Sequence, residues 1–368
     1  MRVAFLGLRG FPNIQGGVET HAENLCPLLA ELGCSVEVIA RSTYQPKAID
    51  TWRSVRFRRI WAPKSKGLEA IVHTFLGVLY AGFVSRPDVL HIQAIGPALM
   101  TPLARLLGLR VVVTHHGPDY DRQKWGRFAK LALRLGERFG MRWSNARIVI
   151  SRVIANIVLQ SHNRESCLIP NGVVLPEIPT STDILTLFGL EAGKYVVLVS
   201  RLVPEKRHLD LIEAFNMAAI PGWKLVIVGA SDHPDAYVQE VLDQARKSPN
   251  IVCTGLQTGH ALRELYGHAG IFVLPSSHEG LPIALLEALS YGLHVIASDI
   301  PANLEVGLPD KHYFPLGQVE ALAARLKEFS TKPRLPEDRD QQRTWVSSRF
   351  NWNDIAIRTL DVYRSVLR

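Results

Sequence analysis

Two acidic residues in the segment IFVLPSSHEGLPIALLEALS are the first candidates for chemistry. Glu279 lies in a loop, and Glu287 lies five residues after Pro282, which marks the first turn of an expected helix. A rise of about 1.5 Å per residue places Glu287 about 7.5 Å along that helix. Its neighbours are leucine and alanine, and a carboxylate among apolar residues must accept hydrogen bonds. Glu287 is either satisfied within the protein or accepts hydrogen bonds from the hydroxyl groups of a ligand.

Two basic residues follow the apolar run YVVLVS, which is typical of a strand. Arg201 comes directly after this run, and Lys206 stands near the start of the next helix. Both cations are therefore expected at the carboxyl edge of a sheet, where two fixed positive charges suit a diphosphate. The alternative is that they form surface salt bridges to Glu205 or Asp210.

A glycine-rich loop, GLRGFPNIQGGVETH, follows the first apolar run. Gly16 and Gly17 precede a helix there, so the backbone can approach a ligand closely and the helix N-terminus favours an anion. A dinucleotide site needs G-x-G-x-x-G and an acidic residue after the second strand. The chain offers Gly7-x-x-Gly10 and Arg41 instead. An NADP-dependent oxidoreductase, with Arg41 on the extra phosphate, stays open as an alternative function.

The elements that position these residues follow from a repeated pattern. Short β-branched apolar runs alternate with helix-length segments, which indicates parallel sheets built from βαβ units. The runs cover residues 2–7, 35–40, 55–60, 88–93, 110–115 and 146–151, and then 195–200, 224–229, 250–255, 271–277 and 294–299. Ligands of such sheets bind at the carboxyl ends of the strands.

The segment 169–183 divides the chain, because it contains three prolines and a glycine and shows no periodicity. We expect an α/β protein of two doubly wound, Rossmann-like domains, residues 1–172 and 173–350, that face each other across a cleft. Residues 351–368 form an amphipathic helix that is expected to pack back toward the first domain.

Composition narrows the class of protein. The 368 residues are 47% hydrophobic and 21% charged, as in globular proteins. Four scattered cysteines without a C-x-x-C pair disfavour a disulfide scaffold and a zinc ribbon, and they fit a reducing cytosol. The segment 67–84 is nearly as long as a membrane span, but it contains Glu69 and His73. It is expected to be a buried or surface-docked helix.

Positive charge is concentrated in the first half of the chain. Residues 1–172 carry a net charge of +12, and the remainder carries −4. Two clusters, residues 53–66 and 121–147, mix Arg and Lys with Trp and Phe, as interfacial segments do. This distribution suggests an anionic partner, which is a nucleic acid, an anionic lipid or a phosphorylated substrate. We expect an anionic membrane surface and no nucleic acid, because no motif typical of nucleic-acid binding is present; a soluble anionic acceptor is the alternative. The alternative for either cluster alone is a solvated basic face.

Six segments in order along the chain resemble one enzyme family. HEGLPIALLE resembles the E-x7-E motif of retaining glycosyltransferases with the GT-B fold, family 4 (group 1), and SRLVPEKR resembles the family's diphosphate-binding loop. GGVETHAENLCPLLAELGCSVEVIA is similar to its first βαβ unit, LIPNGV to its interdomain junction, and VVVTHHG to its strand ending in a histidine of the catalytic centre. FNWNDIAIRTLDVYRSVL is similar to its closing helix. The resemblance runs from Met1 to Arg368.

The resemblance implies a role for each residue of the second half. Arg201 and Lys206 would bind the donor's diphosphate and offset the charge of the leaving group. Glu287 would accept hydrogen bonds from the ribose hydroxyls. Glu279 would contact the donor sugar, assisted by the backbone amides of Gly280 and Leu281 at the helix N-terminus.

In the first half, the resemblance places Gly16 and Gly17 along the cleft and His116 near the reacting carbon. His115 is the alternative if the strand register shifts by one residue. The family also implies retention at the anomeric carbon by a same-face displacement, which depends mostly on leaving-group stabilisation and positioning.

No metal and no cofactor are expected beyond the donor nucleotide sugar, linked to UDP or GDP. Metal-dependent glycosyltransferases of the other main fold use D-x-D. This chain contains Asp119-Tyr120-Asp121 and Asp338-Arg339-Asp340. Arg122 and Lys124 next to the first pair would repel a divalent ion, and the second pair lies in a highly charged stretch.

The expected function is a cytoplasmic glycosyltransferase, peripheral at the inner face of the plasma membrane. It would move a sugar to a glycan or lipid-diphosphate-linked acceptor in bacterial surface polysaccharide biosynthesis. An NADP-dependent oxidoreductase, a nucleotide-sugar epimerase on a similar fold and a non-catalytic nucleotide-sugar sensor are the alternatives.

Overall fold

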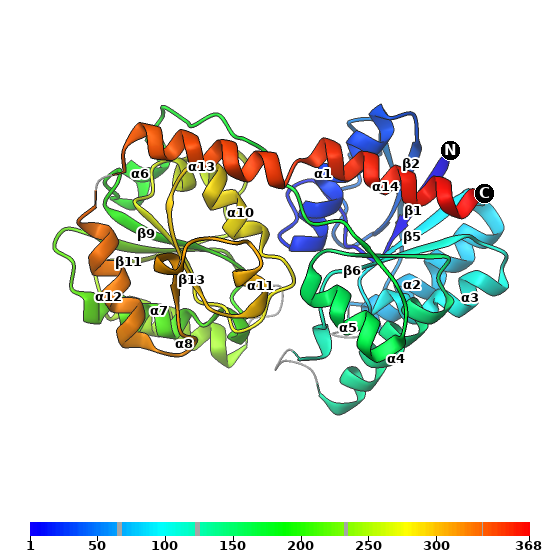
Figure 1. The fold of residues 1–368 in the computed structure, drawn as a ribbon, viewed down its shortest axis with the longest axis horizontal. Coiled ribbons are helices and arrows are strands. Elements are labelled where there is room, and N and C mark those ends of the chain that lie inside the picture. Colours follow the sequence, from blue (N-terminus) through cyan, green and yellow to red (C-terminus); the bar gives the residue numbers. More distant parts are fainter. Residues whose placement is uncertain (65–67, 122–125, 232–234, 333) are drawn as a thin grey trace. The chain divides into compact units, whose positions relative to one another are not determined.

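The computed structural model describes residues 1–64, 68–121, 126–231, 235–332 and 334–368. The chain divides into two compact units (Figure 1). Unit 1 comprises Met1–Asn171 and Trp352–Arg368, and unit 2 comprises Gly172–Asn351. Each of these boundaries lies one residue from the boundary expected from the sequence.

Unit 1 is built on a sheet with the strand order β3-β4-β2-β1-β5-β6-β7-β8. Every neighbouring pair is parallel except β3 and β4, which are antiparallel. The strands are β1 (Arg2–Leu6), β2 (Ser35–Arg41), β3 (Thr51–Trp52), β4 (Val55–Ile60), β5 (Val89–Gln93), β6 (Val111–His115), β7 (Ala146–Val149) and β8 (Cys167–Leu168).

Helices cover both faces of this sheet. They are α1 (Gly17–Glu31), α2 (Leu68–Tyr80), α3 (Thr101–Leu106), α4 (Arg127–Trp143), α5 (Arg152–His162) and α14 (Trp352–Leu367), with the short turns η1 (Ala81–Ser85), η2 (Pro97–Met100) and η3 (Asp119–Asp121). Figure 1 shows α1 and α14 on one face and α2 to α5 on the other. Right-handed crossovers require this division, because α1 connects strands in one direction along the sheet and α2 to α5 connect them in the other.

The C-terminal helix α14 completes the core of unit 1. Trp352, Ile355 and Tyr363 are buried together with Leu25 and Leu29 of α1. The last segment of the chain therefore contributes core residues to the unit that contains the first segment, as its amphipathic pattern and the family resemblance led us to expect.

Unit 2 is built on a parallel sheet with the strand order β11-β10-β9-β12-β13-β14. The strands are β9 (Tyr195–Val199), β10 (Lys224–Val228), β11 (Ile251–Gly255), β12 (Ile271–Leu274), β13 (His294–Ser298) and β14 (Tyr313–Phe314). The helical segments are α6 (Asp183–Phe188), η4 (Pro204–Lys206), α7 (His208–Ala218), α8 (Ala236–Arg246), α9 (Gly259–Gly267), α10 (Ile283–Ser290), α11 (Pro301–Leu304), η5 (Asp310–His312), α12 (Val319–Ser330) and α13 (Pro336–Arg349). The central strands YVVLV and IFVL are apolar throughout because both faces of the sheet are covered.

Both sheets are doubly wound, and each has a point where the chain reverses direction across the sheet. In unit 2 this point lies between β9 and β12, and in unit 1 it lies between β1 and β5. The loops that leave the carboxyl ends of two such strands diverge to opposite faces, which opens a crevice where ligands bind.

The segment expected to be a buried or surface-docked helix forms α2 followed by the π-helical turn η1. Glu69 on α2 is buried; it forms an ion pair with Arg41 at 3.4 Å and accepts a hydrogen bond from Thr43 at 3.2 Å. In the described parts of the chain, Leu68–Ser85 is the one helical stretch long and apolar enough to span a membrane by length and composition, and 33% of it is buried inside the protein.

Candidate active site

The loops after β9 and β12 meet at the reversal point of unit 2. The amide of Ser277, in the second loop, donates to the carbonyl oxygen of Glu205, in the first, at 2.9 Å. Lys206 Nζ lies 2.5 Å from Glu279 Oε1, and both side chains are largely buried. Two residues 73 positions apart in the sequence are therefore held together where a ligand of this sheet would bind.

The ion pair of Lys206 differs from the surface salt bridges considered from the sequence. Lys206 pairs with Glu279 across the two loops, and it is Arg207 that pairs with Asp210, at 2.5 Å. Arg201 lies two residues after the end of β9 and is partly exposed. The loop after β9 thus carries Arg201 and Lys206 at the carboxyl end of this strand, as predicted.

The buried residue His208 holds the loop after β9 from the side of α7. His208, the first residue of α7, contacts Ser200 Oγ at 2.9 Å through Nε2 and the Tyr237 hydroxyl at 3.1 Å through Nδ1. Burial, assisted by the charge of Lys206, lowers the pKa of His208 to about 3, so its imidazole is neutral. Sequence reasoning missed this chain of contacts, because Tyr237 belongs to a different helix.

Glu287 is held by a tyrosine that sequence reasoning also missed. The hydroxyl of Tyr266, on α9, donates to Glu287 Oε2 at 3.0 Å, and its ring stacks on Tyr291 with 5.2 Å between centroids. Burial, and then the charge of Glu287, raise the pKa of Tyr266 well above its ordinary value, so it remains a donor. Glu287 itself is partly exposed. The sequence indicated only that a carboxylate among leucines needs a hydrogen-bond donor, not which residue supplies it.

The start of α10 corrects one expectation. The helix begins at Ile283, and Pro282 precedes it with extended torsion angles, φ −77° and ψ 100°. Gly280 and Leu281 therefore lie in the loop before the helix, not at its N-terminus as expected. Their amides lie just before the first turn of the helix, whose N–H groups have no partner within the helix.

In unit 1, a buried ion pair shapes the glycine loop after β1. Arg9 Nε and Glu19 Oε1 lie 3.1 Å apart, and the amide of Arg9 donates to the same oxygen at 3.1 Å. Burial would raise the pKa of Glu19, but Arg9 outweighs it and holds that pKa below its ordinary value. At Gly16 φ is +155°, and a Cβ atom there would lie 2.1 Å from Glu19 Oε2. Gly17 opens α1 and is exposed.

The two adjacent histidines after β6 have different surroundings. His115 is fully buried and contacts Glu137 Oε1 of α4 at 3.0 Å. His116 is partly exposed, and its Nε2 lies 2.7 Å from Gln93 Oε1 at the end of β5. The structure therefore favours His116 over His115 as the residue that can meet a ligand.

His116 belongs to a cluster of neutral histidines. The ring of His21, on α1, meets His116 edge-on at 5.0 Å between centroids, and His21 Nδ1 contacts Asn171 Oδ1 at 3.0 Å. Burial and the neighbouring histidines hold the pKa of His116 well below its usual range. His116 can therefore serve as a neutral hydrogen-bonding group and not as a cation at neutral pH.

The two acidic pairs considered for a metal lie in different units, and the first is in the loop after β6, three residues beyond His116. Asp119 and Asp121 lie in η3, and Asp338 and Asp340 lie in α13. Among the residues that the structure describes, no group of three or more His, Cys, Asp or Glu is arranged to hold a metal ion. Arg122 and Lys124 lie outside the described residues.

Arg41, the cation that the NADP-dependent alternative requires, is paired with an acidic residue of the protein. Arg41, which would bind the extra phosphate in that alternative, pairs with Glu69 at 3.4 Å, and both side chains are largely buried. Its guanidinium therefore has a structural partner within unit 1.

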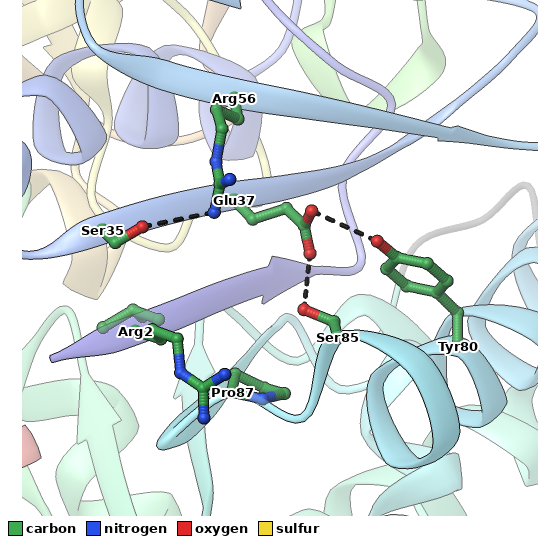
Figure 2. A pocket seen from close by; sticks show the side chains of 8 residues that line it. Arg2, Ser35, Glu37, Arg56, Tyr80, Ser85 and Pro87 are labelled. Atoms are coloured by element: carbon green, nitrogen blue, oxygen red, sulfur yellow. Dashed lines mark hydrogen bonds between the residues drawn. The ribbon is translucent and has the colours of Figure 1, made fainter.

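A cleft of about 340 Å³ lies at the opposite ends of the unit 1 strands, and Figure 2 shows the side chains that line it. It is lined by Arg2, Val3, Ser35, Glu37, Arg56, Tyr80, Ser85 and Pro87. Arg2 and Ser35 are the first residues of β1 and β2, so the cleft lies at the amino ends of these strands. Glu37 already accepts hydrogen bonds from Tyr80 at 3.2 Å and Ser85 at 2.7 Å.

Two family models match the chain on both units. Glycosyl transferases group 1 matches residues 189–344, and Glycosyltransferase Family 4 matches residues 15–176. The first match includes Lys206 and Glu287, and the second includes Gly16 and His116. The chain belongs to the group 1, family 4 glycosyltransferases. The family resemblance of the sequence motifs is therefore confirmed.

Known proteins of related sequence are also glycosyltransferases or sugar-phosphate synthases. This glycosyltransferase is 26% identical over 399 residues to the alpha-maltose-1-phosphate synthase of Mycobacterium tuberculosis, covering 100% of both chains. It is 27% identical over 230 residues to the UDP-Gal:alpha-D-GlcNAc-diphosphoundecaprenol alpha-1,3-galactosyltransferase of Escherichia coli, covering 59% of each chain.

Solved structures share the fold of this glycosyltransferase. Anabaena Alr3699/HepE, in complex with UDP-glucose, matches it with a TM-score of 0.79 and 18% identity, covering 99% of this chain and 100% of the other. The expected fold class, GT-B with two Rossmann-like α/β domains, is confirmed.

Proposed function

We propose that this glycosyltransferase transfers a sugar from a nucleoside-diphosphate sugar, with UDP or GDP as the leaving group, and retains the configuration at the anomeric carbon. The Lys206–Glu279 ion pair at the reversal point of unit 2 carries this proposal, because it fixes a cation at the carboxyl edge of β9. The UDP-glucose complex of Alr3699/HepE, which has the same fold, supports the choice of donor.

The leaving group determines what the protein must supply. As the bond between the anomeric carbon and the phosphate oxygen breaks, negative charge grows on the diphosphate. Arg201 and Lys206 offset that charge, so the reaction needs no divalent ion. The acceptor oxygen attacks from the same face, and its proton passes to the departing phosphate oxygen. Activity should therefore persist in EDTA, and its loss there would contradict metal independence.

Recognition of the nucleotide is assigned to α10 and the loop before it. Glu287 accepts hydrogen bonds from the ribose hydroxyls through the carboxylate that Tyr266 orients. Glu279, which holds Lys206, contacts the donor sugar, and the backbone amides of Gly280 and Leu281 assist it. No cofactor besides the donor is required in this proposal.

Unit 1 supplies the groups for the reacting sugar and the acceptor. Gly16 and Gly17 let the backbone approach the donor, and His116 hydrogen-bonds near the reacting carbon as a neutral imidazole. The proposed acceptor is a glycan or a lipid-diphosphate-linked glycan of bacterial surface polysaccharide synthesis, and the Escherichia coli relative, whose name includes diphosphoundecaprenol, supports the lipid-linked form. We place the reaction on the cytoplasmic side of the membrane as part of the proposal.

Ligand-induced thermal stabilisation tests this proposal against its alternatives. A ligand at a hundred times its dissociation constant stabilises the folded state by about 2.7 kcal/mol. UDP or GDP should raise the melting temperature, and NADP should leave it unchanged. Stabilisation by NADP without any by nucleoside diphosphates would overturn the proposal. Release of UDP or GDP from a nucleotide sugar in the presence of an acceptor distinguishes transfer from mere binding and from epimerisation.

A further inference from the structure

We propose that the outer faces of α2, η1, α3 and α4 form a docking surface for an anionic lipid bilayer. This surface, called the α2–α4 face below, presents large apolar side chains to solvent: Leu68, Ile71, Phe75, Leu106, Phe128 and Leu131. It lies entirely within unit 1, on one face of the sheet (Figure 1). The inference stands on this surface and does not require the proposed sugar transfer.

The outer side of α2 is apolar and uncharged. Leu68, Ile71 and Phe75 are three and four residues apart, so they share one helix face, and they are 58%, 39% and 42% exposed. Phe83 and Val84 of η1 extend the apolar surface and are more than 60% exposed. The one acidic residue of α2, Glu69, points inward to Arg41. An apolar helix face that is left in solvent marks an interaction site.

The outer side of α4 adds cations to apolar residues. Phe128 is 91% exposed and Leu131 is 57% exposed. Arg127, Arg138 and Arg142 are exposed on the same outward side of the helix. The one acidic residue of α4, Glu137, is buried against His115. The outward side therefore carries apolar and positive groups and no negative one, which is the composition of an interfacial helix.

The positive charge of the α2–α4 face favours a negatively charged bilayer as its partner. Between α2 and α4 lies α3, whose Leu106 is 82% exposed and continues the apolar surface. Arginines beside apolar side chains match a bilayer of anionic lipids, where head groups pair with the arginines and acyl chains receive the leucine and phenylalanine side chains. Both acidic residues of α2 and α4 are turned toward the protein, so neither repels such a surface.

The face adjoins the edge of the sheet that holds His116. Because α4 follows β6, its first turn, with Arg127 and Phe128, lies toward the carboxyl edge of the sheet. A bilayer on the α2–α4 face would therefore lie beside the strand ends where a lipid-linked acceptor has to arrive. Only this consequence depends on the proposed function.

The other basic cluster, residues 53–66, is a weaker candidate. Arg59 lies 2.5 Å from Asp50, Arg58 covers the ring of Tyr80, and Arg56 donates to Ser35. Trp52 packs edge-on against Phe11 in the core region. Arg56, Arg58 and Arg59 each contact another residue of unit 1, although Trp61 of the same cluster is 63% exposed. Lys66, Lys124 and Trp125 lie outside the described residues.

Vesicle co-sedimentation of the full chain tests the proposal. The vesicles are phosphatidylcholine alone, or phosphatidylcholine with one quarter phosphatidylglycerol, over a salt series. The cationic variant replaces Arg127, Arg138 and Arg142 by Gln, and the apolar variant replaces Leu68, Ile71 and Phe75 by Gln. Matched controls replace Arg56 and Arg58 by Gln, and the exposed Leu187, Met217 and Leu256 of unit 2 by Gln. Circular dichroism and the melting temperature show that each variant is folded.

We expect the parent to bind anionic vesicles, with binding that weakens as salt rises. The cationic variant should lose about tenfold or more of its partition onto them. The apolar variant should lose the salt-resistant part of binding, and both controls should bind like the parent. No binding by the parent, equal binding to both vesicle types, or an equal loss in a control would overturn the proposal. A dimer in sedimentation velocity that the apolar variant dissociates would identify the face as a contact between copies instead.

Discussion

At the scale of single residues, the Lys206 ammonium is the group on which the proposed chemistry depends most. Glu279 holds it at 2.5 Å, and the amide of Ser277 ties the two loops together, so the cation is positioned before a donor arrives. Preorganised charge of this kind lowers a barrier because no reorganisation is needed when the bond breaks.

Lys206→Ala should therefore reduce turnover more than it reduces stability. Loss of a positioned charge at the leaving group should cost about 2–4 kcal/mol in the barrier, and Arg201→Ala should behave alike. The rate is measured as nucleoside diphosphate released from the donor, with Lys247→Ala, on an exposed part of unit 2, as the control. If the Lys206→Ala enzyme is as fast as the parent, Lys206 does not stabilise the leaving group.

The carboxylate of Glu287 is expected to determine nucleotide affinity. Glu287→Gln replaces one acceptor oxygen by a donor that would face the ribose hydroxyls. The dissociation constant of the bare nucleoside diphosphate, measured by calorimetry, should increase. An unchanged constant would make Glu287 a glutamate satisfied within the protein.

Tyr266 should act on nucleotide affinity only through Glu287. Tyr266→Phe removes the hydroxyl that donates to this carboxylate at 3.0 Å. Because hydrogen bonds to charged groups contribute about 1.5–3 kcal/mol, nucleotide binding should weaken by about tenfold. Tyr195→Phe is the matched control, since it removes a buried hydroxyl that donates to the carbonyl of Leu265 in the same helix. Equal losses in both variants would show a general packing effect.

These residues also show what could be inferred from sequence at this scale. The candidate residues could be named from the sequence because their types and their places after apolar runs are local properties. Their partners were not, since Tyr266 reaches Glu287 from another helix and Arg9 reaches Glu19 from across a loop. Hydrogen-bond partners that depend on tertiary packing leave no spacing to recognise. The choice between His115 and His116 required the register of β6 for the same reason.

At the scale of elements, strands with continuous apolar runs were predicted, and strands without such runs were not. The eleven runs all correspond to strands, with bounds that differ by a few residues. The two-residue strands β3, β8 and β14 were missed, because two residues cannot show a period and their pairing depends on a neighbouring strand. The start of α10 was placed one residue early because Pro282 suits either the first turn or the position before it.

The loop after β1 gives an element-scale prediction. Gly16→Ala would place a Cβ atom 2.1 Å from Glu19 Oε2 at a φ of +155°, so the buried Arg9–Glu19 pair would have to separate. Disturbing a buried ion pair and its backbone should cost about 3 kcal/mol of folding free energy. Gly126→Ala is the control, because a Cβ atom there meets no atom of the described residues within 4 Å and φ is −70°. Urea unfolding that shows equal stability for both variants would contradict this account of the loop.

At the scale of the whole molecule, buried neutral histidines connect stability to pH. Burial lowers the pKa of His21 and His73 to about 4, and of His91 and His208 to about 3. An unfolded histidine titrates near pH 6.5, so between about pH 6.5 and 4.5 the unfolded chain binds protons that the folded chain excludes.

The free energy of unfolding should therefore fall as pH falls through this window. Each such histidine adds a slope of up to about 1.4 kcal/mol per pH unit, and the carboxylates Glu19 and Glu137, whose pKa values are lowered, add theirs at lower pH. Urea unfolding at pH 7.5 and 5.5, followed by tryptophan fluorescence, measures this slope. A free energy of unfolding that is flat between these values would contradict the burial assigned to the four histidines.

Nucleoside diphosphate release from nucleotide sugars is the most direct test of the central claim, that unit 2 binds such a donor through its two loops and activates the leaving group. The parent, Lys206→Ala and Lys247→Ala are compared with UDP-sugars, GDP-sugars and an acceptor extract of bacterial lipids. We predict that the parent and Lys247→Ala release UDP or GDP, and that Lys206→Ala does so at least about 30-fold more slowly. Release at equal rates by all three proteins, or no release from any nucleotide sugar, would contradict the claim.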